Sequence, residues 1–133
     1  MDYRLFYAKE SASDGVRVIL EEIGVPYELI QSTKDRSKPR PLEQLEINPN
    51  GWVPVLMYGG NGIYECAAIT IFLCDLHPEA NLAPNFYEPK RGLYLQTLWC
   101  TFPTLYKLLS KLTIIQIVLP IQLLMNRVPK NEA

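Results

Sequence analysis

A change in the spacing of apolar residues constrains the fold of this chain more than any other feature of its sequence. Residues 3–8 and 25–31 are short, largely apolar and aromatic runs of the length of β-strands. Between them, apolar residues at 16–23 recur at helical spacing and stop at Gly24. The start of the chain therefore predicts a strand, a helix and a second strand.

The middle of the chain predicts a short helix and then a β-hairpin. A polar, basic loop at 32–41 precedes a short helix at 42–47, which ends at the strong turn signal Asn-Pro-Asn-Gly of residues 48–51. Strands at 53–58 and 62–64 then flank two glycines, which can supply the positive φ angles of a hairpin turn.

Helical spacing returns after the hairpin. From Glu65 onward the apolar residues fall on one helical face, and this pattern closes near Pro78. The predicted element order is therefore βαβαββα, with parallel and antiparallel strands in one sheet. The fold class is α/β, and this layout is that of the thioredoxin-like fold.

The remainder of the chain predicts a linker and further helices. Residues 81–88 are rich in proline and asparagine, and a new amphipathic helix follows that can continue past Pro103. We expect Tyr94 and Trp99 to pack this helix onto the preceding domain. The predicted organisation is a thioredoxin-like domain at 1–80, a linker at 81–88 and a short, incomplete all-helical C-terminal region at 89–133.

Charge and hydropathy argue against two classes of partner. Thirteen basic and fourteen acidic side chains give a net charge of −1, so no strong field draws the chain to nucleic acid or to acidic membranes. The most apolar run, at 112–125, is shorter than the roughly 20 residues of a membrane helix and is interrupted by glutamine and proline. We expect no nucleic-acid partner and no membrane partner.

The cysteines give no sign of metal binding or of a disulfide framework. Cys66, Cys74 and Cys100 form no Cys-x-x-Cys pair, and with one histidine they make no ligand set, so we expect no metal. The N-terminus lacks a basic stretch followed by a long apolar region. A cytoplasmic location with reduced thiols is the simplest expectation.

Three segments, in order, carry a resemblance to a known family. They are NPNGWVPVL at 48–56, YECAAI at 64–69 and FLCDLHP at 72–78. These resemble the NPxGxVPxL, (E/D)SxAI and YLxxxxP signatures of cytosolic glutathione S-transferases, and the resemblance spans about residues 3–99. It implies a protein that binds glutathione as co-substrate and activates its thiolate for attack on a small apolar electrophile.

The resemblance also implies which residues hold the tripeptide. In the family, the valine before a cis proline pairs its backbone with glutathione, which points to Val53 and Pro54, although an ordinary trans bond is the commoner state of such pairs. Glu65 and Cys66 stand at a helix start that suits the γ-glutamyl carboxylate, and Glu65 either binds the ligand's amino group or is a plain helix-start acid. Trp52 either donates its indole N–H to the ligand or shelters the hairpin.

One departure from the family pattern, at Cys66, and the choice of an activating hydroxyl bear on these roles. Serine is usual where this chain has Cys66, and a thiol donates more weakly than a hydroxyl. In serine-type members of the family a hydroxyl donor at a helix N-terminus keeps the glutathione sulfur as a thiolate, and the resemblance implies Ser11 as the first candidate for this donor and Ser13 as the second. Either serine could instead be an ordinary helix cap.

The length of the chain leaves the activity open. In the family, a full helical second domain forms most of the electrophile pocket, and after about Trp99 the sequence resembles none of it. A natural truncation and a shifted reading frame would each explain this, and the alternative function is a non-catalytic glutathione-binding or protein-interaction module. Apolar helix surface left uncovered would favour a homodimer or higher oligomer.

Overall fold

The computed structural model describes residues 3–108, with side chains as far as residue 100. The apolar run at 112–125 lies outside the described residues. The elements are β1 (Tyr3–Tyr7), α1 (Ser13–Ile23), β2 (Tyr27–Gln31), α2 (Leu42–Ile47), β3 (Val55–Tyr58), β4 (Asn61–Tyr64), α3 (Cys66–Leu76), the 3-10 turn η1 (Pro78–Ala80) and α4 (Arg91–Leu108). This order confirms the predicted thioredoxin-like βαβαββα fold followed by a helix.

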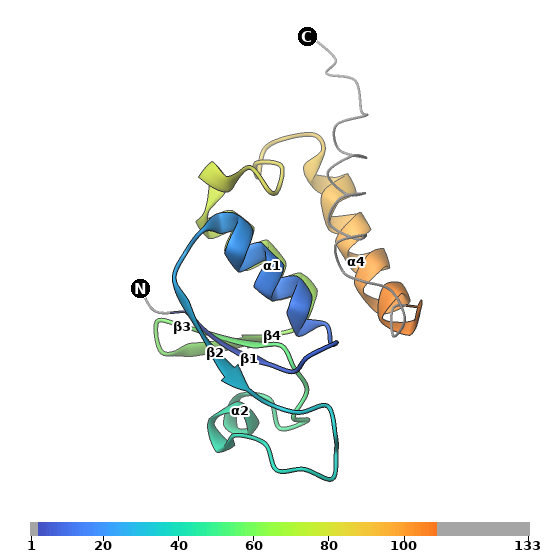
Figure 1. Ribbon diagram of the computed structural model, residues 1–133. Coiled ribbons are helices and arrows are strands. Elements are labelled where there is room, and N and C mark those ends of the chain that lie inside the picture. Colours follow the sequence, from blue (N-terminus) through green and yellow to red (C-terminus); the bar gives the residue numbers. More distant parts are fainter. Residues whose placement is uncertain (1–2, 109–133) are drawn as a thin grey trace.

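The four strands form one mixed sheet in the order β2-β1-β3-β4. β2 runs parallel to β1, whereas β3 is antiparallel to both β1 and β4. Helices α1 and α3 pack together on one face of this sheet, and the short α2 lies on the other (Figure 1). The domain is therefore a three-layer sandwich around a central sheet.

The main core fills the space between the sheet and the helices α1 and α3. It contains side chains with no exposed surface from the sheet and from both helices, namely Leu5, Leu20, Leu56, Ile69 and Leu73. Full burial of an aliphatic side chain of this size contributes about 1.5–3 kcal/mol, so this cluster is the chief source of stability. α1 ends as predicted at Gly24, whose φ of 77° is the left-handed conformation that glycine adopts at low cost.

A second, smaller core lies on the opposite face, beneath α2. Phe6, Val55 and Met57 of the sheet are buried there, and Ile47 of α2 packs against them. The backbone of Gly62 in β4 comes so close to this helix that an added Cβ would lie 2.5 Å from Ile47 Cγ2. The absence of a side chain at Gly62 therefore allows α2 to pack closely against the sheet.

Arg91 joins α4 to the domain that precedes it. Its Nη2 donates to Asp75 Oδ2 of α3 at 3.0 Å, and its Nη1 donates to the Pro84 carbonyl at 3.1 Å. Tyr94 is buried as expected, but Trp99 is 76% exposed, so the expectation that it packs onto the first domain was wrong. Helical spacing explains the difference, because Trp99 lies five residues beyond Tyr94 and is turned away from the buried side.

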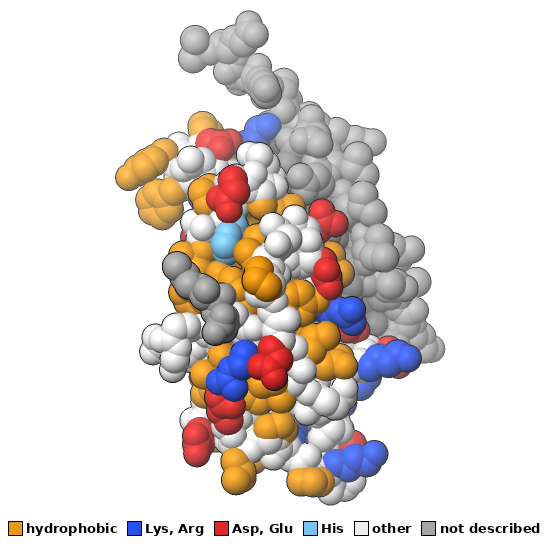
Figure 2. Space-filling model, turned by 60° about the vertical axis from the view of Figure 1, so that its left-hand side comes forward, with side chains coloured by type: hydrophobic (Ala, Val, Ile, Leu, Met, Phe, Trp, Pro, Cys, Tyr) orange, Lys and Arg blue, Asp and Glu red, His pale blue; other side chains and the backbone are white. Residues whose placement is uncertain are grey.

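The surface is mixed in charge. On the face shown in Figure 2, acidic and basic side chains are interspersed among hydrophobic ones, and neither sign forms a continuous patch. Within the part of the chain that the structure describes, no helix combines the length and the apolar character needed to cross a bilayer.

Gly62→Ala should lower the free energy of unfolding by about 1–3 kcal/mol, because its Cβ would overlap Ile47. Urea unfolding would measure this, with Gly92→Ala as the matched control, since no atom lies within 4 Å of a Cβ added at Gly92. In an Ile47→Ala background the effect of Gly62→Ala should largely disappear. Equal unfolding midpoints for Gly62→Ala and the parent protein would contradict this account of how α2 is seated.

Candidate functional site

Strand register brings the predicted site residues to one end of the sheet. Val55, the first residue of β3, lies opposite Phe6 near the end of β1 and opposite Tyr64 at the end of β4. The loop that leads from β1 to Ser11, the segment before β3 and the junction after β4 therefore meet at this end. We call it the site end of the sheet.

Two serine hydroxyls close the turn between β1 and α1. Ser11 Oγ lies 2.6 Å from the Ala8 carbonyl and 2.6 Å from Ser13 Oγ, and it accepts the Ser13 N–H at 3.2 Å. Ser13 Oγ accepts the Ala8 N–H at 3.1 Å. Ser13 is fully buried, whereas Ser11 is half-buried and has surface to offer a ligand. Ala12, the residue before α1, already has helical backbone angles (φ −58°, ψ −19°), and Ser11 Oγ accepts the N–H two residues further on, as a helix-capping hydroxyl does.

The Val53–Pro54 peptide bond is cis, which confirms the isomer expected from the motif. The β-ladder begins at Val55, so the backbone of Val53 lies outside the regular strand pairing at the site end. Val53 is half-buried and Pro54 is buried.

Trp52 lies at the surface next to this bond and is 44% exposed. Its ring faces the loop before α2, where the Arg36 guanidinium stands 4.8 Å from the ring centroid, within the range of a cation–π interaction. Its indole is thus partly sheltered by the basic loop while remaining accessible.

Glu65 joins β4 to α3 in a conformation that is unfavourable for its residue type. Its φ is 77° and its ψ is 115°, a combination that costs a residue with a side chain about 1–3 kcal/mol. Its side chain is exposed. α3 begins at the next residue, so the first N–H groups of this helix, which have no partner within it, open at the site end.

The Cys66 thiol points inward, away from the helix end. Sγ donates to the Ala12 carbonyl at 3.0 Å, which ties the start of α3 to the start of α1. Burial, with a smaller contribution from the charge of Glu65, raises the pKa of this thiol from 9.0 to about 12. Cys66 is therefore an un-ionised structural donor at neutral pH.

A buried amide that the sequence did not single out supports the site. Gln44 of α2 is fully buried; its Nε2 donates to the Gly51 and Trp52 carbonyls at 3.0 and 3.2 Å, and its Oε1 accepts the Ser32 hydroxyl at 2.5 Å. Asn48 adds a bond from Nδ2 to the Trp52 carbonyl at 3.3 Å. Gln44 went unnoticed because a glutamine in a short polar helix is usually exposed.

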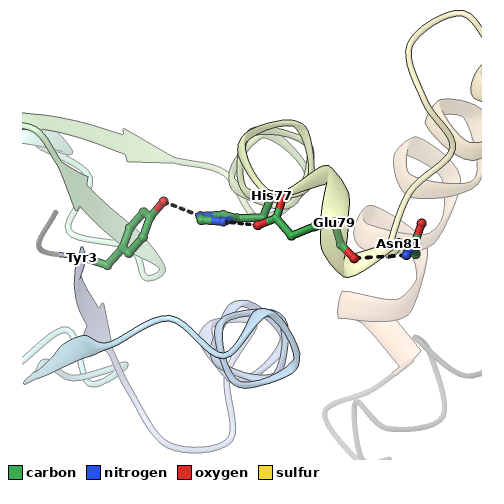
Figure 3. Close-up of polar contacts among 4 residues, drawn as sticks. All are labelled: Tyr3, His77, Glu79 and Asn81. Carbon is green, nitrogen blue, oxygen red and sulfur yellow. Dashed lines mark hydrogen bonds and ion pairs between the residues drawn. The ribbon is translucent and has the colours of Figure 1, made fainter.

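The one histidine lies at the opposite end of the sheet from these residues. His77 Nε2 is 2.8 Å from the hydroxyl of Tyr3, the first residue of β1, and Nδ1 is 3.1 Å from Glu79 Oε1, as Figure 3 shows. Glu79 in turn accepts Asn81 Nδ2 on its backbone carbonyl at 3.0 Å. This chain of contacts fastens the end of α3 to β1. Among the described residues no group of three or more His, Cys, Asp or Glu side chains is arranged to hold a metal ion.

The fold and the arrangement at the site end define a thioredoxin-like domain of the glutathione S-transferase type. Residues 11–76 match the family described as "Glutathione S-transferase, N-terminal domain". The chain belongs to the glutathione S-transferase family, as its three motifs suggested.

Individual relatives agree with this assignment. Glutathione S-transferase Z2 of Arabidopsis thaliana is 32% identical over 91 residues, which cover 68% of this chain and 41% of the relative. A glutathione transferase structure from Methylococcus capsulatus matches 94% of this chain and 64% of its own, at 25% identity and a TM-score of 0.68. A sphingomonad glutathione S-transferase complexed with glutathione matches 72% of this chain and 49% of its own, at 27% identity and a TM-score of 0.62. The chain thus spans less than two thirds of each of these proteins.

Cys66→Ala should make the free energy of unfolding less sensitive to alkaline pH. Because the folded protein favours the neutral thiol, the associated stability is complete below about pH 9 and is lost as the pH rises toward 12. Between about pH 8 and about pH 11 the parent protein should therefore lose about 2 kcal/mol more than the variant. Urea titrations across this range would measure it, with Cys100→Ala, at an exposed thiol, as the control. Parallel curves for Cys66→Ala and the parent would refute the shift.

Proposed function

We propose that the site end of the sheet binds glutathione and activates its thiol, so that the thiolate attacks a small apolar electrophile. The observation that carries this proposal is the register of β3, which brings Ser11, Val53 and Glu65 to one end of one sheet. Family membership adds support, and the sphingomonad relative is described as complexed with glutathione.

The ligand contacts follow from the chemistry of the three segments. The backbone of Val53 lies beyond the β-ladder and can pair with an extended tripeptide as an added strand would. The open N-terminus of α3 suits the γ-glutamyl carboxylate, and the exposed Glu65 carboxylate suits the neighbouring ammonium group. Since the Cys66 thiol is engaged with Ala12, the carboxylate would rely on backbone N–H groups. Trp52 and Pro54 would border the bound peptide.

Of the two serines, Ser11 is the one we assign to thiol activation. It is accessible, and its hydroxyl can turn from the Ala8 carbonyl toward a bound thiolate, which is a stronger acceptor because it is charged. A free thiol titrates near 8.5, so a donor that stabilises the thiolate raises the reactive fraction at neutral pH. The buried Ser13 hydroxyl would hold the Ser11 side chain in position through the hydrogen bond between their Oγ atoms.

Assembly and location belong to the same proposal. Leu93, Leu95 and Trp99 of α4 are 46%, 39% and 76% exposed, which supports a homodimer or higher oligomer that covers this helix. We infer a cytoplasmic setting, where glutathione is kept reduced.

Calorimetric titration with glutathione, alongside a conjugation assay with a small chloronitroaromatic electrophile, tests the proposal. Binding with turnover supports a transferase. Binding without turnover would support the alternative, a non-catalytic glutathione-binding or protein-interaction module. Absence of binding to correctly folded protein would refute both.

Glu65→Ala and Glu65→Gly should each weaken glutathione binding about tenfold, the equivalent of about 1.4 kcal/mol, because each removes the partner of the ligand's ammonium group. The two variants should differ in stability, since glycine relieves the strain of the positive φ and alanine does not. We expect Glu65→Gly to be more stable than Glu65→Ala by about 1 kcal/mol. Calorimetry and urea unfolding measure the two effects separately, and unchanged affinity in both variants would remove Glu65 from the site.

Ser11→Ala should raise the pKa of bound glutathione and slow conjugation about 10²-fold or more, while changing glutathione affinity little, because a donor to the thiolate acts on ionisation. Ultraviolet absorbance of the thiolate against pH follows this directly. Ser13→Ala is the comparison: if it moves the titration and Ser11→Ala does not, the assignment of the activating hydroxyl is wrong.

A further inference from the structure

An apolar side chain of similar size could fill the space that Gln44 occupies, so packing alone does not explain its buried amide. It is the buried residue of α2, a six-residue helix whose other side chains keep some exposure. An amide buried without partners costs roughly 1–3 kcal/mol, so its presence in the interior depends on the bonds that it makes. Each of its polar atoms has such a partner.

These bonds form one chain of contacts within the site end, from the end of β1 to the segment before Val53. The Tyr7 carbonyl at the end of β1 accepts the Ser32 N–H at 2.7 Å, and the Ser32 hydroxyl donates to Gln44 Oε1. From Gln44 Nε2 the chain continues to the carbonyls of Gly51 and Trp52, the two residues before Val53. Gln44 thus links that segment to the end of β1, and Asn48 adds a further bond to the Trp52 carbonyl.

We propose that Gln44 is a positioning residue, which holds the Gly51 and Trp52 carbonyls so that the backbone of Val53 is aimed at the bound tripeptide. This inference rests on the proposed function of the site end. The role needs an amide specifically, because Gln44 accepts from one hydroxyl and donates to two carbonyls. A methionine of similar size would remove the partner of the Ser32 hydroxyl and of the Gly51 carbonyl and would leave the Trp52 carbonyl with Asn48 alone, and a glutamate would have no donor for the carbonyls.

The test compares Gln44→Met with Leu20→Ala, which lowers stability through the main core near the far end of α1. Hydrogen exchange of peptides covering residues 48–55 reports on the segment without ligand, and calorimetry reports glutathione affinity. Gln44→Met should speed exchange at 48–55 selectively and weaken glutathione binding about tenfold. Leu20→Ala should change affinity less than about twofold, because its destabilisation is distant from the site.

Ser32→Ala provides a milder variant in case Gln44→Met does not fold. It removes one of the three bonds and should weaken binding about two- to threefold with a smaller rise in local exchange. If Gln44→Met or Ser32→Ala binds glutathione with the same affinity as the parent protein, the positioning role of Gln44 is overturned and the proposed function remains intact. If the parent itself does not bind glutathione, the proposed function fails; selective exchange at 48–55 would then still support the holding role of Gln44, and its absence would overturn it.

Discussion

The antiparallel pairing of β3 with β1 is the constraint on which the rest of the structure depends. Alternate residues of β3 face different cores: Leu56 is fully buried beneath α1 and α3, and its neighbour Val55 is fully buried beneath α2. A slip of one residue would exchange these two sets of side chains between the two cores. The register is therefore fixed from both faces, and with it the position of Val53, two residues before the strand.

The elements of the domain could be read from the sequence because their signals are local. The spacing of apolar residues and the turn residues predicted α2 at 42–47, where the structure has Leu42–Ile47, and predicted that α1 stops at Gly24. The hairpin could be inferred in the same way from its glycines. The cis Val53–Pro54 bond was predicted on different grounds, from the resemblance of its motif, since nothing in the pair itself selects that isomer.

The contacts that shape the site could not be read in this way because they join residues distant in sequence. The inward turn of the Cys66 thiol depends on the Ala12 carbonyl, 54 residues earlier. The burial of Gln44 depends on Ser32 and on the loop before β3, and each of these residues alone resembles a surface residue. The exposure of Trp99 likewise depends on which side of α4 packs against α3. Apolar residues occur around most of this helix, so the sequence alone does not specify that side.

The distribution of buried polar groups distinguishes the two ends of the sheet. Among the described residues, six polar or charged side chains are buried, and four of them, Ser13, Ser32, Gln44 and Asn48, cluster at the site end. The strained Glu65 lies there as well, whereas the opposite end is closed by the ordinary contacts of His77 with Tyr3 and Glu79. A hydrophobic core alone requires neither buried amides nor a glutamate at positive φ. In our proposal this end of the sheet binds the tripeptide. Buried polar side chains and a strained residue are expected at such a place, because the backbone groups there must be held in position for a ligand.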